Sequence, residues 1–98
     1  MSKAGRRPRS PERQAEREEF ARVIGAELRR MRKVIPLRMV DVAQAAGVSR
    51  NYVQFVETGG DCCSPDVLIR IVYALGGTME IFGASIDRAL KRAEQLRP

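Results

Sequence analysis

Apolar side chains in the first third of the chain recur at the spacing of an α-helix. Phe20, Ile24, Leu28 and Met31 follow one another at intervals of four, four and three residues, which places them on one helical face. Ser10-Pro11-Glu12 supplies a helix start, because serine caps a helix, proline fits its first position and an acidic side chain favours its first turn. The pattern predicts a helix from residue 11 to about residue 32, with this face in the core and Gly25 at a close helix contact.

Two shorter apolar patterns flank a tight turn between residues 37 and 59. Val42, Ala43 and Ala46 form one helical face, and Gly47 follows where a helix that ends in a left-handed residue favours glycine. Ser49 is a good N-cap for a second helix. This helix therefore begins at Ser49, three residues after the first one ends at Ala46. The segment therefore predicts two short helices joined by a turn.

The second of these short helices has two unlike faces. Val53 and Val56 face inward, and Gly59 ends the helix. The outer face carries Arg50, Asn51, Gln54 and Phe55. An apolar inner face beneath amide and guanidinium groups suits a helix that lies in the major groove of DNA.

The last third of the chain predicts two further helices. A second Ser-Pro-acid start at residues 64–66 precedes an apolar face made by Leu68, Ile71, Val72 and Leu75. Thr78 then caps a segment with a heptad-type stripe, formed by Met79, Phe82, Ile86, Ala89, Ala93 and Leu96. This stripe fits a helix that folds back on its own domain or a dimerisation helix, and a short strand at residues 78–82 is a third alternative.

Composition narrows the fold class. The 98 residues suffice for one domain with a single core, and 44% of them are hydrophobic. Aromatic residues make up only 5% and tryptophan is absent, so we expect an aliphatic core. The predicted class is all-α, a compact bundle of about five helices.

Positive charge is concentrated in the N-terminal part of the sequence. The formal net charge is +6, which favours a polyanionic partner. Four basic residues without an acidic one lie within residues 1–9, namely Lys3, Arg6, Arg7 and Arg9. We expect this arm to be disordered when free and to contact DNA, with a solubilising tail as the alternative.

Other classes of site find little support in the sequence. No apolar run approaches the roughly 18 residues of a membrane span, and no signal peptide is visible, so we expect a cytoplasmic protein. Cys62 and Cys63 are adjacent, and without histidine or a second cysteine pair a zinc site is not expected. No cofactor is predicted. The sequence shows neither paired carboxylates on an apolar face nor a phosphate-binding loop, so we do not expect an enzyme.

Taken together, the positions above resemble the lambda-repressor-like helix-turn-helix family of DNA-binding proteins, also called the Cro/C1 or XRE type. The similarity extends over about residues 20–83, through Leu28-Arg29, Arg32, Leu37, Val42-Ala43, Ala46-Gly47-Val48-Ser49, Val53, Val56-Glu57, Gly59, Leu68, Ile71, Ala74 and Leu75-Gly76. The resemblance implies that Arg32 forms an ion pair with Glu57. Three positions depart from the family pattern. Arg38 stands where the family usually has a threonine or serine N-cap, and Met39 replaces a glutamine that commonly contacts phosphate. Phe55 stands where family members usually carry a polar or basic residue. Arg38 is a poor N-cap, so we expect that helix start to fray or to be capped from elsewhere.

The expected function is sequence-specific DNA binding by a transcriptional regulator, most simply a repressor that occupies an operator. We expect base readout by Arg50, Asn51, Gln54 and Tyr52, and phosphate contacts by Lys33, Arg38, Arg6, Arg7 and Arg9. The alternative is an antiactivator or antitoxin-like module that binds a protein, a transcriptional activator or a toxin, through Phe55, Met39 and Tyr52.

The expected domain organisation has three parts. A basic arm covers residues 1–10, a helix-turn-helix domain covers residues 11–83, and a C-terminal helical extension covers residues 84–98. This extension is the candidate dimerisation element, and the expected partners are double-stranded DNA and a second copy of the chain, with no membrane.

Overall fold

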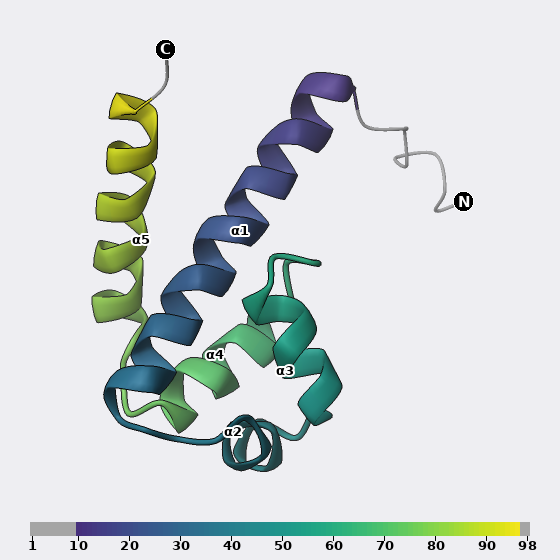
Figure 1. The fold of residues 1–98 in the computed structure, drawn as a ribbon, viewed down its shortest axis with the longest axis vertical. Coiled ribbons are helices and arrows are strands. Elements are labelled where there is room, and N and C mark those ends of the chain that lie inside the picture. The colour runs from purple at the N-terminus through teal and green to yellow at the C-terminus, as the bar shows by residue number, and fades with distance from the viewer. Residues whose placement is uncertain (1–9, 97–98) are drawn as a thin grey trace.

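The computed structural model describes residues 10–96, which form five α-helices and no strand (Figure 1). The helices are α1 (Pro11–Val34), α2 (Met39–Ala46), α3 (Arg50–Glu57), α4 (Pro65–Ala74) and α5 (Met79–Gln95). The all-α class and the number of helices are therefore confirmed. The basic arm, with Arg6, Arg7 and Arg9, lies outside the described residues.

The long helix α1 stands between the two other parts of the fold. It packs against α3 on one side and against α5 on another, while α2 packs against both α3 and α4. In Figure 1 the three short helices gather beside the C-terminal half of α1, and α5 runs along its other side. Helix α1 therefore connects the helix-turn-helix pair with the C-terminal helix.

The core is almost entirely aliphatic, as the composition predicts. It takes side chains from every helix, and only one of its buried hydrophobic residues is aromatic. These residues are Ala21, Leu28, Val42, Ala43, Ala46, Val53, Val56, Ile71, Val72, Leu75 and Phe82. Their burial from water supplies the main driving force for folding, at about 25 cal/mol per Å² of apolar surface.

Gly25 brings the backbones of α1 and α3 together. A Cβ atom built on Gly25 would lie 2.1 Å from the carbonyl oxygen of Val56 and 2.9 Å from that of Glu57. Any larger side chain at this position would push the two helices apart. The close helix contact predicted for Gly25 is thus present, and it sets the distance between α1 and the C-terminal end of α3.

Helix α5 runs unbroken from Met79 through Gly83 to Gln95, so the short strand considered at residues 78–82 is wrong. The hydroxyl of Thr78 accepts a hydrogen bond from the Ile81 amide at 3.2 Å, which starts the helix where the strand was considered. Phe82 is buried in the core, and Met79 and Ile86 pack partly against it. The first half of α5 therefore folds back on its own domain.

Phe20 differs from the other members of its predicted face. Leu28 is buried, and Ile24 and Met31 pack partly against the core, but Phe20 remains 39% exposed. Its ring borders an apolar groove of about 260 Å³ between α1 and α5, lined by Phe20, Val23, Ile24, Cys62, Ile86 and Leu90. The prediction that Phe20 belongs to the core is wrong, because no helix covers the N-terminal half of α1 at this point.

Candidate nucleic-acid interface

The turn between α2 and α3 has the predicted geometry. Gly47 takes the left-handed conformation with φ 73°, and the amide of Val48 donates to the carbonyl oxygen of Ala43 at 3.0 Å. The Ser49 hydroxyl accepts a hydrogen bond from the Tyr52 amide at 3.0 Å and so caps α3. These local interactions fix the direction in which α3 leaves α2.

Helix α3 presents a polar surface to solvent over a buried apolar one. Val53 and Val56 are almost fully buried, whereas Arg50, Asn51 and Gln54 are exposed. Because Arg50 and Asn51 lie in the first turn, their side chains extend from the end of the helix that points away from α1. This placement is required of residues that read base edges, and their role in base readout stays a prediction.

Two aromatic or apolar side chains predicted for the outer surface lie closer to the core. Tyr52 and Met39 are partly buried, and both pack against the core. Burial from water raises the pKa of the Tyr52 hydroxyl, and the thiol of Cys63 contributes as well. Of the three residues proposed as a protein-binding surface, Phe55 alone remains clearly exposed.

Phe55 is 48% exposed and lies on the outer side of α3. Its ring covers Gly60, because a Cβ atom built on Gly60 would lie 2.3 Å from the ring carbon Cε1. Part of the ring therefore packs on the loop after α3, and part of it meets solvent. Phe55 is at once a packing residue for the loop after α3 and a candidate contact for a partner.

The ion pair expected between Arg32 and Glu57 is present and bidentate. Arg32 Nε donates to Glu57 Oε2 at 2.7 Å and Nη2 donates to Oε1 at 2.9 Å. The side chains are only 11% and 4% exposed, respectively. The Glu57 carboxylate raises the pKa of Arg32 through these hydrogen bonds. Glu57 is the last residue of α3, where the partial negative charge of the helix end disfavours a carboxylate. The positive charge of Arg32 offsets this effect.

Arg32 has a further partner that the sequence did not indicate. Its Nη1 donates to the carbonyl oxygen of Leu37 at 3.1 Å, in the loop that precedes α2. One guanidinium therefore holds the end of α1, the end of α3 and the approach to α2 together. The partner is a backbone oxygen, so no residue type at position 37 could have revealed it.

The start of α2 is capped from within the helix. Asp41, at the third helical position, accepts from the Arg38 amide at 3.3 Å and from the Arg38 guanidinium at 3.0 Å. The guanidinium lowers the pKa of the Asp41 carboxyl. The fraying considered for this helix start is not seen, and the acidic residue three positions after Arg38 was the signal to use.

Arg38 and Lys33 occupy different settings as candidate phosphate contacts. The Arg38 side chain is 77% exposed, but its charge is paired with that of Asp41. Lys33 is exposed in the last turn of α1. Both stay predictions, as do the contacts of the arm outside the described residues.

Two further observations concern other kinds of site. Among residues 10–96, no group of three His, Cys, Asp or Glu side chains is placed to hold a metal ion. No single helix in this range is long and apolar enough to cross a membrane, and α4 and α5 reach that length and hydropathy only as a pair bent by 102°.

Comparison with known proteins agrees with this geometry. The family model of the helix-turn-helix domain matches residues 23–80, which is more than half of the chain. A crystal structure of the clp gene regulator ClgR from Corynebacterium glutamicum is similar with a TM-score of 0.70 and 25% identity, over 78% of this chain and 82% of that chain. A second crystal structure of ClgR gives a TM-score of 0.67 and 24% identity, over 71% of this chain and 91% of that chain. No curated protein sequence matches the chain. The family match, together with the buried and exposed faces of α3, shows that the chain belongs to the helix-turn-helix family of DNA-binding proteins.

Proposed function

We propose that the protein is a sequence-specific transcriptional regulator that represses by occupying an operator. The observation that carries this proposal is the exposed row of Arg50, Asn51 and Gln54 above a buried inner face of α3. Arginine pairs best with guanine, and asparagine and glutamine pair best with adenine, so such a row can distinguish base pairs in the major groove. The similarity to a gene regulator, ClgR, supports a role of the same general kind.

Phosphate contacts would come from the basic residues around α3. Lys33 at the end of α1 and Arg38 at the start of α2 are both exposed. The arm carries Arg6, Arg7 and Arg9 and would add further contacts. Because contacts to phosphate position a protein without reading sequence, these residues would set affinity while α3 sets specificity.

A homodimer would place two copies of α3 on one operator. The groove bordered by Phe20 and Leu90 is apolar, and Leu96 at the end of α5 is 79% exposed. We assign a second copy of the chain to this surface, because the heptad-type stripe of α5 continues past the part that packs on its own domain. Two recognition helices would then read half-sites about 34–36 Å apart.

The test of base readout is a footprint of the purified protein on genomic DNA, followed by operator titration. The Arg50→Ala, Asn51→Ala, Gln54→Ala variant should lose specific binding, and Arg50→Ala alone should cost about 1–3 kcal/mol. The control Arg13→Ala, Gln14→Ala removes an exposed arginine and an exposed amide at the start of α1. Normal operator binding by the triple variant would refute the assignment of α3 as the reading helix.

The second candidate function is binding of a protein, as an antiactivator or antitoxin-like module. The exposure of the Phe55 side chain favours it, because aromatic side chains that become buried on binding dominate many protein interfaces. In a pull-down from the same lysate, Phe55→Ala should weaken such a complex by about 2 kcal/mol or more. Tyr73→Ala, at an exposed aromatic position on α4, is the matched control. An unchanged complex would exclude Phe55 as its anchor.

A further inference from the structure

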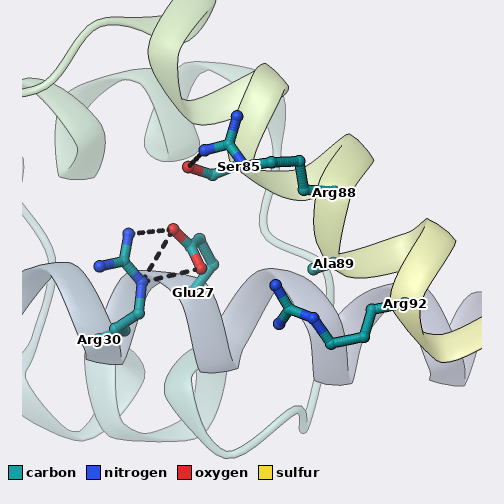
Figure 2. A pocket seen from close by; sticks show the side chains of 6 residues that line it. All are labelled: Glu27, Arg30, Ser85, Arg88, Ala89 and Arg92. Carbon is teal, nitrogen blue, oxygen red and sulfur yellow. Dashed lines mark hydrogen bonds and ion pairs between the residues drawn. The ribbon is translucent and has the colours of Figure 1, made fainter.

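A polar pocket between α1 and α5 contains more positive charge than its carboxylate can balance. The pocket has a volume of about 260 Å³ and is lined by Glu27, Arg30, Ser85, Arg88, Ala89 and Arg92. Figure 2 shows Glu27 and Arg30 on α1 opposite Ser85 on α5, the Arg88 side chain extended along α5 to Ser85, and the Arg92 guanidinium turned toward α1. Three guanidinium groups thus line this small space with one carboxylate.

The single carboxylate is already paired with one of the arginines. Both oxygens of Glu27 accept hydrogen bonds from Arg30, whose Nε lies 3.1 Å from Oε1 and 3.2 Å from Oε2. These hydrogen bonds lower the pKa of Glu27, so the carboxylate keeps its charge. The charge of Arg88 also acts on Glu27 and lowers its pKa, but one carboxylate balances only one of the three guanidinium groups, so two positive charges remain in excess.

The two remaining arginines have few partners of their own. Arg88 Nη2 donates to the hydroxyl of Ser85 at 3.1 Å, which is a neutral acceptor. Arg92 forms no hydrogen bond or ion pair through its side chain with any other residue of the range 10–96. The two lie four residues apart on one face of α5, where like charges destabilise a helix by about 0.2–0.5 kcal/mol. An anion bound between them would remove this repulsion.

We propose that this pocket binds a small oxyanion with two or more negative charges, of phosphate or carboxylate chemistry. The planar guanidinium group presents paired N–H donors that match the oxygens of a phosphate or a carboxylate. The two unbalanced positive charges set the charge of the ligand. The pocket volume of about 260 Å³ lies a little below the usual range of ligand pockets, roughly 300–1,000 Å³, and suits a compact anion.

The position of the pocket separates it from the DNA-reading surface. Gly25 and Arg32 of α1 face α3. Glu27 lies two residues after Gly25, and Arg30 lies two residues before Arg32. Two residues correspond to a rotation of roughly 200° around a helix, so Glu27 and Arg30 lie on the opposite side of α1. The pocket therefore opens on the side of α1 away from α3. A duplex held by α3 would not reach Arg88 and Arg92, which favours a small ligand over DNA and makes this site independent of the proposed operator binding.

The test is titration of the full-length protein with inorganic pyrophosphate and, separately, with citrate, by calorimetry at an ionic strength held constant with NaCl. We expect saturable binding of one anion per chain, and the tighter of the two probes identifies phosphate or carboxylate chemistry. Arg88→Gln, Arg92→Gln should weaken this binding by about tenfold or more, which corresponds to about 1.4 kcal/mol. Arg92→Gln alone should weaken it as well without disturbing any described side-chain contact.

A matched control removes the same charge elsewhere. Arg29→Gln, Lys91→Gln lowers the net charge by two at exposed positions on α1 and α5 outside the pocket, and it should keep the affinity for pyrophosphate. Equal weakening by both double variants, or heat that does not saturate as the anion is added, would overturn the proposal. So would a reduced salt dependence of DNA binding in Arg88→Gln, Arg92→Gln, because these arginines would then contact the phosphates of the duplex.

Discussion

Removal of Glu57 tests whether the bidentate pair holds α3 in place. In Glu57→Ala, the Arg32 guanidinium keeps only the Leu37 carbonyl oxygen as a partner while it remains almost fully buried. Loss of one partner from a buried pair costs about 3–5 kcal/mol, because the other charge is left uncompensated. Native proteins are stable by only about 5–15 kcal/mol, so the change removes a large share of the total.

The assays are equilibrium unfolding in urea, which gives the free energy of unfolding, and thermal unfolding, which gives Tm, both followed by circular dichroism. Since about 1 kcal/mol shifts Tm by roughly 4–8 °C in a domain of this size, the destabilisation corresponds to a Tm lower by roughly 12 °C or more. Arg32→Leu, Glu57→Leu should be less destabilised than the two single variants added together, because it leaves no charge unpaired. A Tm within about 1 °C of the wild type would refute the reasoning.

The chain offers a matched pair in an exposed setting. Arg38 and Asp41 form the same two kinds of contact, but their side chains are 77% and 39% exposed. Water and salt screen such a pair, so Asp41→Asn should destabilise the protein far less than Glu57→Gln does. Equal effects of the two substitutions would show that burial does not determine the strength of the inner pair.

Four further changes have expected outcomes. Gly25→Ala should destabilise the protein in thermal unfolding, because the new Cβ would lie 2.1 Å from the Val56 carbonyl oxygen. In contrast, a Cβ at Gly83 would meet nothing within 4 Å, so Gly83→Ala should stabilise α5 by about 1 kcal/mol through the higher helix propensity of alanine. Deletion of residues 2–9 should reduce the slope of log K against log salt by about 0.9 for each phosphate that the arm neutralises, and an unchanged slope would show that the arm neutralises none. Leu96→Asp should yield monomers in sedimentation with an unchanged helical spectrum, and a monomeric wild type would disprove the dimer.

Local signals in the sequence were sufficient to predict most of the helix boundaries. Ser10, Ser49 and Thr78 each accept a hydrogen bond from the amide three residues later, as their positions before apolar patterns indicate. Gly47 takes the left-handed conformation that its place after Ala46 predicts. These features depend on residues within one turn of each other, which is why the sequence alone could reveal them.

Features that depend on contacts between distant helices were harder to predict. Phe20 shares the spacing of its face, but its exposure depends on where α5 lies relative to α1. Tyr52 is predicted as a contact for bases or for a protein partner, but its side chain packs partly against the core. The pocket around Arg88 and Arg92 lies between α1 and α5, which are more than forty residues apart in the sequence. The pattern of neither helix alone therefore indicates it.

The contacts of α3 divide the helix into an anchored end and a presenting end. Gly25 and Arg32 lie seven residues apart, hence on one face of α1, and both hold the C-terminal end of α3, at Val56 and Glu57. The first turn, which carries Arg50 and Asn51 of the residues proposed to read bases, makes no hydrogen bond to α1 within the part of the chain that the structure describes. Substitutions at the presenting end should therefore alter base preference at little cost in stability. Substitutions at the anchored end should alter stability first, and DNA binding only through the orientation of the helix.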